Sequence, residues 1–418
     1  MKNIETLIKE NDASLSVLYG ADEAARTRII KAVEEFTKLY GEQEYSVFSV
    51  SGRSEISGNH TDHNRGEVLA ASVSLDIIAV AAATEDGMIR IKSEGFSRHE
   101  VDLGDLDPVE SETGTSAALI RGVCDGLVKR NRAIGGFCAY MTSSVLGGSG
   151  LSSSAAFEDM IGNIENHLYN DGEIGYIEIS QISQYAENNH FGKPCGLMDQ
   201  IACACGGFVH IDSAYPANPV CEKIDLDLAS HGYNLCVVNT GGSHADLTDD
   251  YASVPAEMKK VASFFGKEVL RELTKEDVIA NIPALREFAG DRAVLRALHF
   301  FDENARVKEA SRYLAADDID GFFGVIKASG ISSSMMLQNY FSPKSPAEQG
   351  ISLACAVANS VLTDGGVCRV HGGGFAGTIQ AFVPTAKLEE FKKVMENAFG
   401  AGAVTVLSVR PVGMTKIF

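Results

Sequence analysis

Residues 145–160, VLGGSGLSSSAAFEDM, place three glycines and four serines directly before a stretch with helical periodicity. The run GFCAYMTSS at 136–144 predicts a strand before this segment, and Leu151, Ala155 and Met160 begin the apolar face of a helix after it. Glycine lets the backbone approach an anion closely, and the first turn of a helix presents free N–H groups. The segment predicts an anion-binding loop, although a serine-rich helix cap has the same signature. The lysine of a Walker A loop, GxxxxGK[ST], is missing.

The rest of the chain mixes helical and strand periodicity. Apolar residues at helical spacing predict helices at 22–40, 115–131 and 386–399 and across most of 254–362. Strands are predicted at 45–51, 136–144, 234–240 and 403–409, and two more lie within 67–93. Because strands and helices follow one another without a regular βα alternation, we expect an α+β fold of two domains. Turn residues at 215–219 predict the boundary, which gives an N-terminal domain at 1–215 and a C-terminal domain at 216–418.

The net charge argues against two classes of partner. Lys and Arg total 36 and Asp and Glu total 56, a formal net charge of −20. Such a surface repels nucleic acid and anionic lipid, and no basic run offsets it, so we expect small-molecule partners and no membrane partner. Nine cysteines without a CxxC pair, and a start without secretory or transit character, predict reduced thiols and a cytoplasmic protein. The sequence does not predict an oligomeric state.

Two carboxylates lie in or near a second glycine-containing segment, residues 192–200. Asp199 belongs to CGLMDQ (195–200), and Glu187 lies on the helix predicted before it. The two side chains can converge on one Mg²⁺ or share a substrate. An isolated carboxylate is more commonly a solvated surface group, so the pair alone does not assign a site. Lys193, between them in the sequence, is interpreted as a solvated loop lysine.

A third glycine run, GGGFAG at 372–377, satisfies the pattern GxGxxG. A dinucleotide-binding fingerprint must follow a strand and open a helix. Here the glycines lead into TIQAFVP, a β run that ends in proline. The context therefore disfavours a dehydrogenase and leaves a glycine turn against which another loop can pack.

Four segments together resemble a known family. GRSEISGNHTDHNRG (52–66), GSGLSSSAA (148–156), CGLMDQ (195–200) and HGGGFAG (371–377) are similar, in this order, to the four signatures of galactokinases, which belong to the GHMP small-molecule kinases. The resemblance runs from about residue 30 to the C-terminus. It implies a two-domain GHMP kinase fold with the active site in the interdomain cleft. It also implies transfer of a phosphoryl group from ATP, with Mg²⁺, to the anomeric C1 hydroxyl of a galactose-like sugar.

The resemblance further implies roles for individual residues. The glycine-serine loop would hold the ATP phosphates through backbone amides, so that no Walker lysine is needed. Asp199 would face the C1 hydroxyl of the sugar, and Arg53 would lie close to Asp199 and the transferred phosphoryl group. Ser153 or Ser154, together with Glu187, would hold Mg²⁺. The other matched positions are the sugar-binding residues Asn59, His60, Asp62 and Tyr251 and the nucleotide-binding residues Gly148, Ser149, Gly150, Leu151, Ser152, Ser153, Ser154, Gly373 and Gly374.

The chemistry leaves two roles open for Asp199. Phosphoryl transfer passes through a loose transition state, so positioning and charge stabilisation dominate. Arg53 can neutralise charge on the phosphoryl oxygens, and it would also depress the pKa of Asp199. An anionic Asp199 can accept the sugar proton, but a strongly depressed pKa makes it a poor base. It therefore either abstracts the proton or only orients the hydroxyl.

The sugar loop departs from the family pattern GEHTDY. This chain reads GNHTDH, with Asn59 in place of the glutamate that contacts the C6 end of the sugar, His63 in place of tyrosine and Arg65 in place of a usual glycine. These changes make the loop less negative and would tolerate a C6 carboxylate, so galacturonate is an alternative to galactose, as are arabinose and N-acetylgalactosamine. We favour galactose because the other matched sugar positions are kept. A catalytically silent, sugar-responsive regulator is a third possibility, which the retained Asp199 disfavours.

Overall fold

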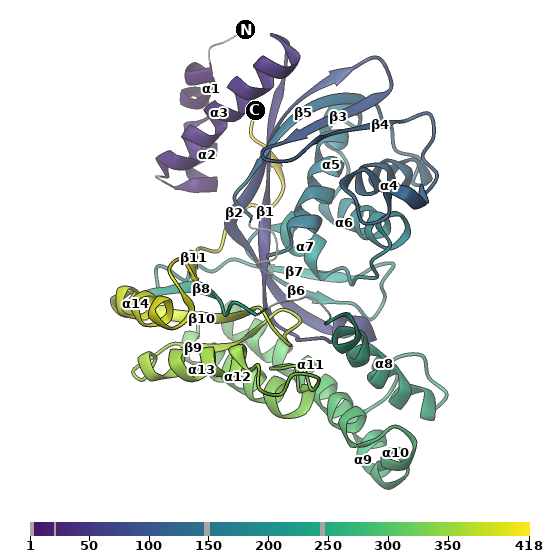
Figure 1. The fold of residues 1–418 in the computed structure, drawn as a ribbon, viewed down its shortest axis with the longest axis vertical. Helices are drawn as coiled ribbons and strands as arrows, with labels where there is room; N and C mark the ends of the chain where they lie inside the picture. The colour runs from purple at the N-terminus through teal and green to yellow at the C-terminus, as the bar shows by residue number, and fades with distance from the viewer. Residues whose placement is uncertain (1–3, 21, 146–150, 243–246) are drawn as a thin grey trace. The chain divides into compact units, whose positions relative to one another are not determined.

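The structure is a computed structural model that describes residues 4–20, 22–145, 151–242 and 247–418 (Figure 1). Its backbone divides into two units. Unit 1 comprises Met1–Arg53, Ser72–Gly207 and Arg410–Phe418, and unit 2 comprises Ser54–Ala71 and Phe208–Val409. The turn residues predict a single boundary after residue 215, whereas the chain passes between the units four times. Two long strands, β1 (Ser46–Ser57) and β2 (Glu67–Thr84), contribute residues to both units, which no local turn signal indicates.

Unit 1 is built on a mixed sheet. Its strands follow the order β12-β1-β2-β5-β3-β4, in which β2 pairs antiparallel with β5 and β3 pairs parallel with β5. In β3 the sequence MIRIKS alternates, and its two isoleucines are fully buried, as expected for a strand with one face on the core. The strands not yet given are β3 (Met88–Ser93), β4 (Arg98–Asp102), β5 (Gly136–Ser143) and β12 (Thr415–Lys416).

Helices cover both faces of this sheet (Figure 1). On one face, α1 (Ile4–Glu10), α2 (Asp12–Tyr19) and α3 (Glu23–Tyr40) pack apolar side chains on β1, β2 and β5. The other face carries the helices that follow β4. They are α4 (Ser116–Lys129), α5 (Ser153–Tyr169), α6 (Tyr176–Ala186) and α7 (Met198–Cys205), with the short η2 (Glu110–Glu112) and the π-helical turn η3 (Glu187–Phe191).

Unit 2 contains a four-stranded antiparallel sheet in the order β11-β8-β10-β9. Buried residues of this sheet form one core with α13 and α14. A hairpin of β6 and β7 pairs with the first residues of β2. The elements are β6 (Phe208–Asp212), β7 (Val220–Ile224), β8 (Tyr233–Asn239), β9 (Val367–His371), β10 (Thr378–Pro384), β11 (Val404–Leu407), α12 (Ile319–Ser332), η5 (Ser333–Leu337), α13 (Gly350–Val361), η6 (Thr385–Lys387) and α14 (Leu388–Phe399).

A second core of unit 2 is helical. It packs apolar residues of five helices with Leu337 and Phe375. These elements are α8 (Thr248–Phe264), η4 (Leu270–Glu272), α9 (Lys275–Ala280), α10 (Ile282–Phe288) and α11 (Asp291–Ala315), and η1 (Asp62–Asn64) lies in the loop after β1. The predicted helical stretch at 254–362 is confirmed by α8 to α13. Among the described helices, none combines the length and apolar character needed to cross a membrane.

The strand predicted at 45–51 extends further than expected. Strand β1 continues through GRSEIS to Ser57, and all of these residues are buried although five of the six are glycine or polar. Buried polar side chains require hydrogen-bond partners, and in unit 2 these come from distant strands. Gln380 of β10, for example, donates to the Ser54 hydroxyl at 2.8 Å. The loop itself begins at Gly58.

Candidate active site

In unit 1, the first turn of α7 presents Asp199 to Arg53 of β1. Arg53 Nε lies 2.7 Å from Asp199 Oδ1 and Arg53 Nη2 lies 2.9 Å from Oδ2, a bidentate ion pair. The Ser152 hydroxyl donates to the same Oδ2 from the start of α5. The Arg53 side chain is 8% exposed and that of Asp199 is 31% exposed, so the carboxylate is both held in place and reachable.

Asp199 is an anion of low basicity. Burial alone would raise the pKa of Asp199, but the charge and hydrogen bonds of Arg53 and the hydrogen bond from Ser152 lower it to about 2. A carboxylate with this pKa accepts hydrogen bonds at neutral pH but takes a proton poorly. The low pKa therefore suits Asp199 to accepting a hydrogen bond from a hydroxyl group more than to removing its proton.

We expect the stabilising effect of this ion pair to disappear at low pH. Because the pKa of Asp199 is lower in the folded protein than its ordinary value of 3.8, the carboxylate stabilises the folded state above about pH 4, and this contribution is lost as the pH falls towards about 2. In denaturant titrations, the unfolding free energies of the wild type and Asp199→Asn should differ by a constant amount from about pH 5 to pH 7. Below about pH 4 the difference should shrink. A difference that stays constant down to about pH 2.5 would contradict the low pKa.

Glu187 forms a second cluster in unit 1, at the start of η3. Its side chain is 3% exposed. Oε1 accepts a hydrogen bond from the Ser154 hydroxyl at 3.3 Å and lies 2.9 Å from Lys193 Nζ. Oε2 accepts from Gln200 Nε2 at 3.0 Å, and Gln200 is fully buried. One oxygen of Glu187 is thus fixed by the core, and the other faces a serine and a lysine.

Ser152 precedes α5 with an unusual backbone conformation. Its φ of 58° and ψ of 61° lie in the left-handed region, which is uncommon for residues other than glycine. Such conformations cost about 1–3 kcal/mol and persist where the surrounding contacts impose them. Here the contact is the hydrogen bond from the Ser152 side chain to Asp199. The strained turn therefore places the serine hydroxyl on the carboxylate at the start of the helix.

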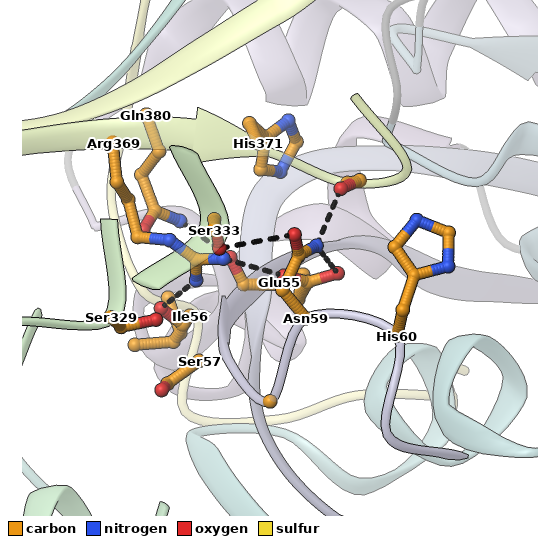
Figure 2. Close-up of polar contacts among 12 residues, drawn as sticks. Glu55, Ile56, Ser57, Asn59, His60, Ser329, Ser333, Arg369, His371 and Gln380 are labelled. Carbon is orange, nitrogen blue, oxygen red and sulfur yellow. Dashed lines mark hydrogen bonds and ion pairs between the residues drawn. The ribbon is translucent and has the colours of Figure 1, made fainter. Parts of the chain in front are cut away.

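In unit 2, the loop after β1 is anchored by the side chain of Asn59, which is fully buried (Figure 2). Its Nδ2 donates to Glu55 Oε1 at 3.0 Å and to the Gly372 carbonyl at 2.7 Å. Its Oδ1 accepts from Asn339 Nδ2 at 2.7 Å and from the Ser333 hydroxyl at 3.3 Å. Both hydrogens of the amide and both lone pairs of its oxygen are engaged within the protein. A direct contact between Asn59 and a ligand would require one of these bonds to break.

Glu55 is in turn paired with Arg369 of β9 (Figure 2). Arg369 Nη2 lies 3.1 Å from Glu55 Oε1, and Nη1 donates to the Ile56 carbonyl at 2.7 Å. The two side chains are 0% and 5% exposed, so this is a wholly buried ion pair. It holds the end of β1 against β9 and orients Glu55 towards Asn59.

Three consecutive carbonyls of the late glycine turn accept hydrogen bonds. Asn59 donates to Gly372, the His60 ring lies 2.8 Å from the Gly373 carbonyl, and Tyr251 donates to Gly374 at 3.1 Å. Burial lowers the pKa of His60 to about 4, so its neutral ring can donate. A Cβ at Gly373 would lie 2.5 Å from the Tyr251 ring. The turn therefore needs glycine there for another segment to pack close.

Other predicted residues of the sugar loop have simpler surroundings. Asp62 Oδ1 accepts from the His63 backbone N–H at 2.9 Å, and the Asp62 side chain is 15% exposed. Arg65, whose cation was part of the case for galacturonate, pairs with Glu268 at 2.8 Å on the surface. The structure thus gives the Arg65 charge a carboxylate partner within the protein.

Comparison with known proteins identifies the family. Two family models match the sequence: the galactokinase galactose-binding signature over residues 34–83 and the N-terminal domain of GHMP kinases over residues 118–207. A galactokinase of Streptomyces coelicolor is 30% identical over 378 residues, which are 89% of this chain and 93% of that protein. The chain belongs to the galactokinase family. A galactokinase of Actinobacillus pleuropneumoniae is also 30% identical, over 88% of this chain and 93% of its own length.

Solved structures show the same fold. The galactokinase of Lactococcus lactis, crystallised with galactose, superposes with a TM-score of 0.78 at 23% identity and covers 93% of this chain and 100% of its own. A mevalonate kinase of Methanococcus jannaschii superposes with a TM-score of 0.61 at 12% identity, over 88% of this chain and 99% of its own. These comparisons confirm the α+β GHMP kinase fold and the family that the four motifs predict.

Of the residues predicted to bind the nucleotide before α5, the structure describes some and not others. Gly148, Ser149 and Gly150 lie outside the described residues. Leu151 is buried, and its carbonyl accepts the Arg53 backbone N–H at 3.2 Å. Ser153 is half-buried at the first position of α5. Ser152 and Ser154 face different carboxylates, those of Asp199 and Glu187.

Lys193, interpreted from the sequence as a solvated loop lysine, instead pairs with Glu187. Several other residues that organise the two clusters were not predicted. Gln200 directly follows Asp199 in CGLMDQ, so its place in the motif was a usable signal. Glu55 lies four residues before Asn59, but Arg369 and Asn339 are more than 250 residues away in sequence. No local pattern connects those two residues with the sugar loop.

Proposed function

We propose that this chain transfers the γ-phosphoryl group of ATP to the C1 hydroxyl of galactose. The observation that carries the proposal is the Arg53–Asp199–Ser152 cluster, in a chain that matches the galactokinase galactose-binding signature. Membership of the GHMP kinases implies the use of ATP. Positioning and charge stabilisation are the main demands of phosphoryl transfer, and this cluster supplies both.

In this mechanism Asp199 orients the acceptor hydroxyl. Its anionic carboxylate accepts a hydrogen bond from the C1 hydroxyl, which aims the oxygen at the phosphorus atom. The low pKa of Asp199 favours late proton transfer, when the hydroxyl oxygen has become more acidic on bonding to phosphorus. Arg53 holds Asp199 and places a fixed positive charge beside the phosphoryl oxygens.

The residues near the start of α5 fit a magnesium ion. Mg²⁺ prefers oxygen ligands and is commonly held by one or two protein groups together with phosphate oxygens and water. Glu187 and the Ser154 hydroxyl, with 3.3 Å between their oxygens, offer such a pair and favour Ser154 over Ser153 as the ligand. In the described part of the chain no group of three or more His, Cys, Asp or Glu side chains could hold a metal, and a phosphate-bound Mg²⁺ does not require one. When bound, the ion would neutralise charge on the phosphates.

The remaining predicted residues keep their proposed roles. Backbone amides of 148–154 hold the phosphates, and Gly373 and Gly374 belong to the turn that carries the sugar-loop contacts. His60, Asp62 and Tyr251 contact the sugar. Asn59 acts on the sugar through its hydrogen bond to the Gly372 carbonyl, because its own polar atoms are engaged. This role differs from a direct contact with the C6 end of the sugar.

A coupled ADP-release assay tests the proposal with galactose, galacturonate, arabinose and N-acetylgalactosamine. We expect the highest kcat/KM with galactose, and a value lower by about a hundredfold or more with galacturonate. The reason is that a carboxylate without a cationic partner is costly to bury, and Arg65 would have to leave Glu268 to supply one.

The Asp199→Asn variant serves as the control for ADP that is released without sugar phosphorylation. A preference for galacturonate would replace the proposed substrate. Sugar binding without ADP release from any of the four sugars would instead indicate a regulator.

A further inference from the structure

We propose that Lys193 is the side chain that contacts the ATP phosphates in this chain, in the place of the missing Walker lysine. The inference rests on the proposed function, in which the start of α5 holds the nucleotide. It adds to that function one residue, which lies outside the four family motifs of this sequence.

The position of Lys193 supports this role. Its Nζ lies 2.9 Å from Glu187 Oε1, and the same oxygen lies 3.3 Å from the Ser154 hydroxyl in the first turn of α5. Anions are favoured at this end of a helix, because the backbone N–H groups there lack partners. A lysine head group within reach of Ser154 is therefore within reach of an anion bound at the turn.

The side chain of Lys193 is also free to move while its backbone is fixed. The Lys193 N–H donates to the Glu187 carbonyl at 3.1 Å, which anchors the residue on η3. The Lys193 side chain is 61% exposed, whereas that of Glu187 is 3% exposed and its second oxygen is held by Gln200. The lysine can therefore change its partner without any rearrangement of the core.

Mg²⁺ and Lys193 would compete for the same oxygen of Glu187. If Glu187 Oε1 coordinates Mg²⁺, Lys193 must leave this oxygen, since two cations repel each other at ligand distance. The Asp199 carboxylate also attracts Lys193, but Arg53 and Ser152 already hold it, so the nucleotide phosphates proposed at the start of α5 would be the open partner. Lysine is suited to this contact because its ammonium is a compact charge on a flexible stem.

A structural ion pair with the buried Glu187 carboxylate is the competing explanation for Lys193. Because the lysine itself is 61% exposed, water screens the pair, and its contribution to stability should be small. Lys129 offers a matched control in the same unit, because it is 58% exposed and pairs with Asp125 at 2.6 Å on α4. Both lysines are thus exposed and paired with a carboxylate, but only Lys193 lies beside the start of α5.

Calorimetric binding of MgATP and of AMP, without sugar, tests the inference on wild type, Lys193→Met and Lys129→Met. We expect Lys193→Met to weaken MgATP binding by about ten- to a hundredfold, the range for a hydrogen bond to a charged group. AMP binding should change by less than about twofold, because AMP lacks the β- and γ-phosphates. Lys129→Met should bind both nucleotides like the wild type, and all three proteins should unfold at similar temperatures.

The outcomes separate the two proposals. If the wild type binds no MgATP, the proposed function itself fails. If the wild type binds MgATP and Lys193→Met binds it equally well, only the role of Lys193 is overturned. Equal weakening of MgATP and AMP by Lys193→Met, or weakening by Lys129→Met as well, would also overturn it, since the effect would not originate at the outer phosphates.

Discussion

Replacing Asp199 by asparagine is expected to lower kcat by about three orders of magnitude, within the range for a positioned acid or base. The substitution keeps the shape of the side chain but removes the charge that Arg53 and Ser152 orient. The asparagine can accept only through its single oxygen, and its NH₂ group would face the Arg53 guanidinium. The acceptor hydroxyl then loses the anion that aims it at the phosphorus. Steady-state ADP release at saturating ATP and galactose measures the effect.

ATP binding should change little in the same variant. The phosphates are assigned to the start of α5 and not to Asp199, so the calorimetric Kd for MgATP should stay within about threefold of the wild type. Asp212→Asn is a matched control, because Asp212 is 24% exposed and pairs with Arg271 at 2.7 Å within unit 2. It should retain turnover. Near-normal turnover by Asp199→Asn, or equal losses in both variants, would contradict the assignment of Asp199.

Local periodicity was sufficient to predict many of the elements. The helix predicted at 22–40 is α3, Glu23–Tyr40, since its apolar residues repeat on one face that packs against the sheet. The strand predicted at 136–144 is β5, Gly136–Ser143, and every residue of it except the last is buried. Such elements can be predicted from the sequence, because the spacing of apolar residues within the segment determines which face is apolar.

Features that depend on distant partners could not be predicted. The continuation of β1 through Ser54 and Glu55 looks like a polar loop, because its partners Gln380 and Arg369 lie more than 300 residues later. The motifs predicted Asn59 as a direct sugar contact, whereas its amide is engaged by Glu55, Gly372 and Asn339. A motif indicates which positions matter, but the direction of a side chain depends on residues that the motif does not contain.

The same buried network makes Arg369 a sensitive position of unit 2. Replacing Arg369 by methionine is expected to destabilise the protein by about 3–5 kcal/mol, the cost of removing one partner of a buried ion pair. Methionine fills part of the volume but leaves the Glu55 carboxylate, 5% exposed, without its arginine partner. The Ile56 carbonyl also loses a donor at 2.7 Å. Denaturant titration at pH 7 measures the free energy of unfolding.

A second substitution shows whether this cost comes from the charge. In Arg369→Met combined with Glu55→Gln, no unpaired charge remains, so part of the lost stability should return. The glutamine can still accept from Asn59 Nδ2 through its oxygen. If the double variant is as unstable as the sum of the two single variants, the loss reflects packing around Arg369 and not the uncompensated carboxylate.

The Arg369 variant also tests whether the network acts on the sugar. Arg369 orients Glu55, Glu55 holds Asn59, and Asn59 holds the Gly372 carbonyl, so loosening the first contact should raise the KM for galactose more than the KM for ATP. Arg410→Met is the matched control, because Arg410 and Asp76 form a wholly buried ion pair in unit 1, 3.1 Å apart. Asp76 keeps a second arginine partner, Arg28, so this variant should lose less stability than Arg369→Met, and it should leave the galactose KM unchanged. Equal increases in the galactose KM of both variants would mean that lost stability, and not the contact from Asn59 to the glycine turn, weakens sugar binding.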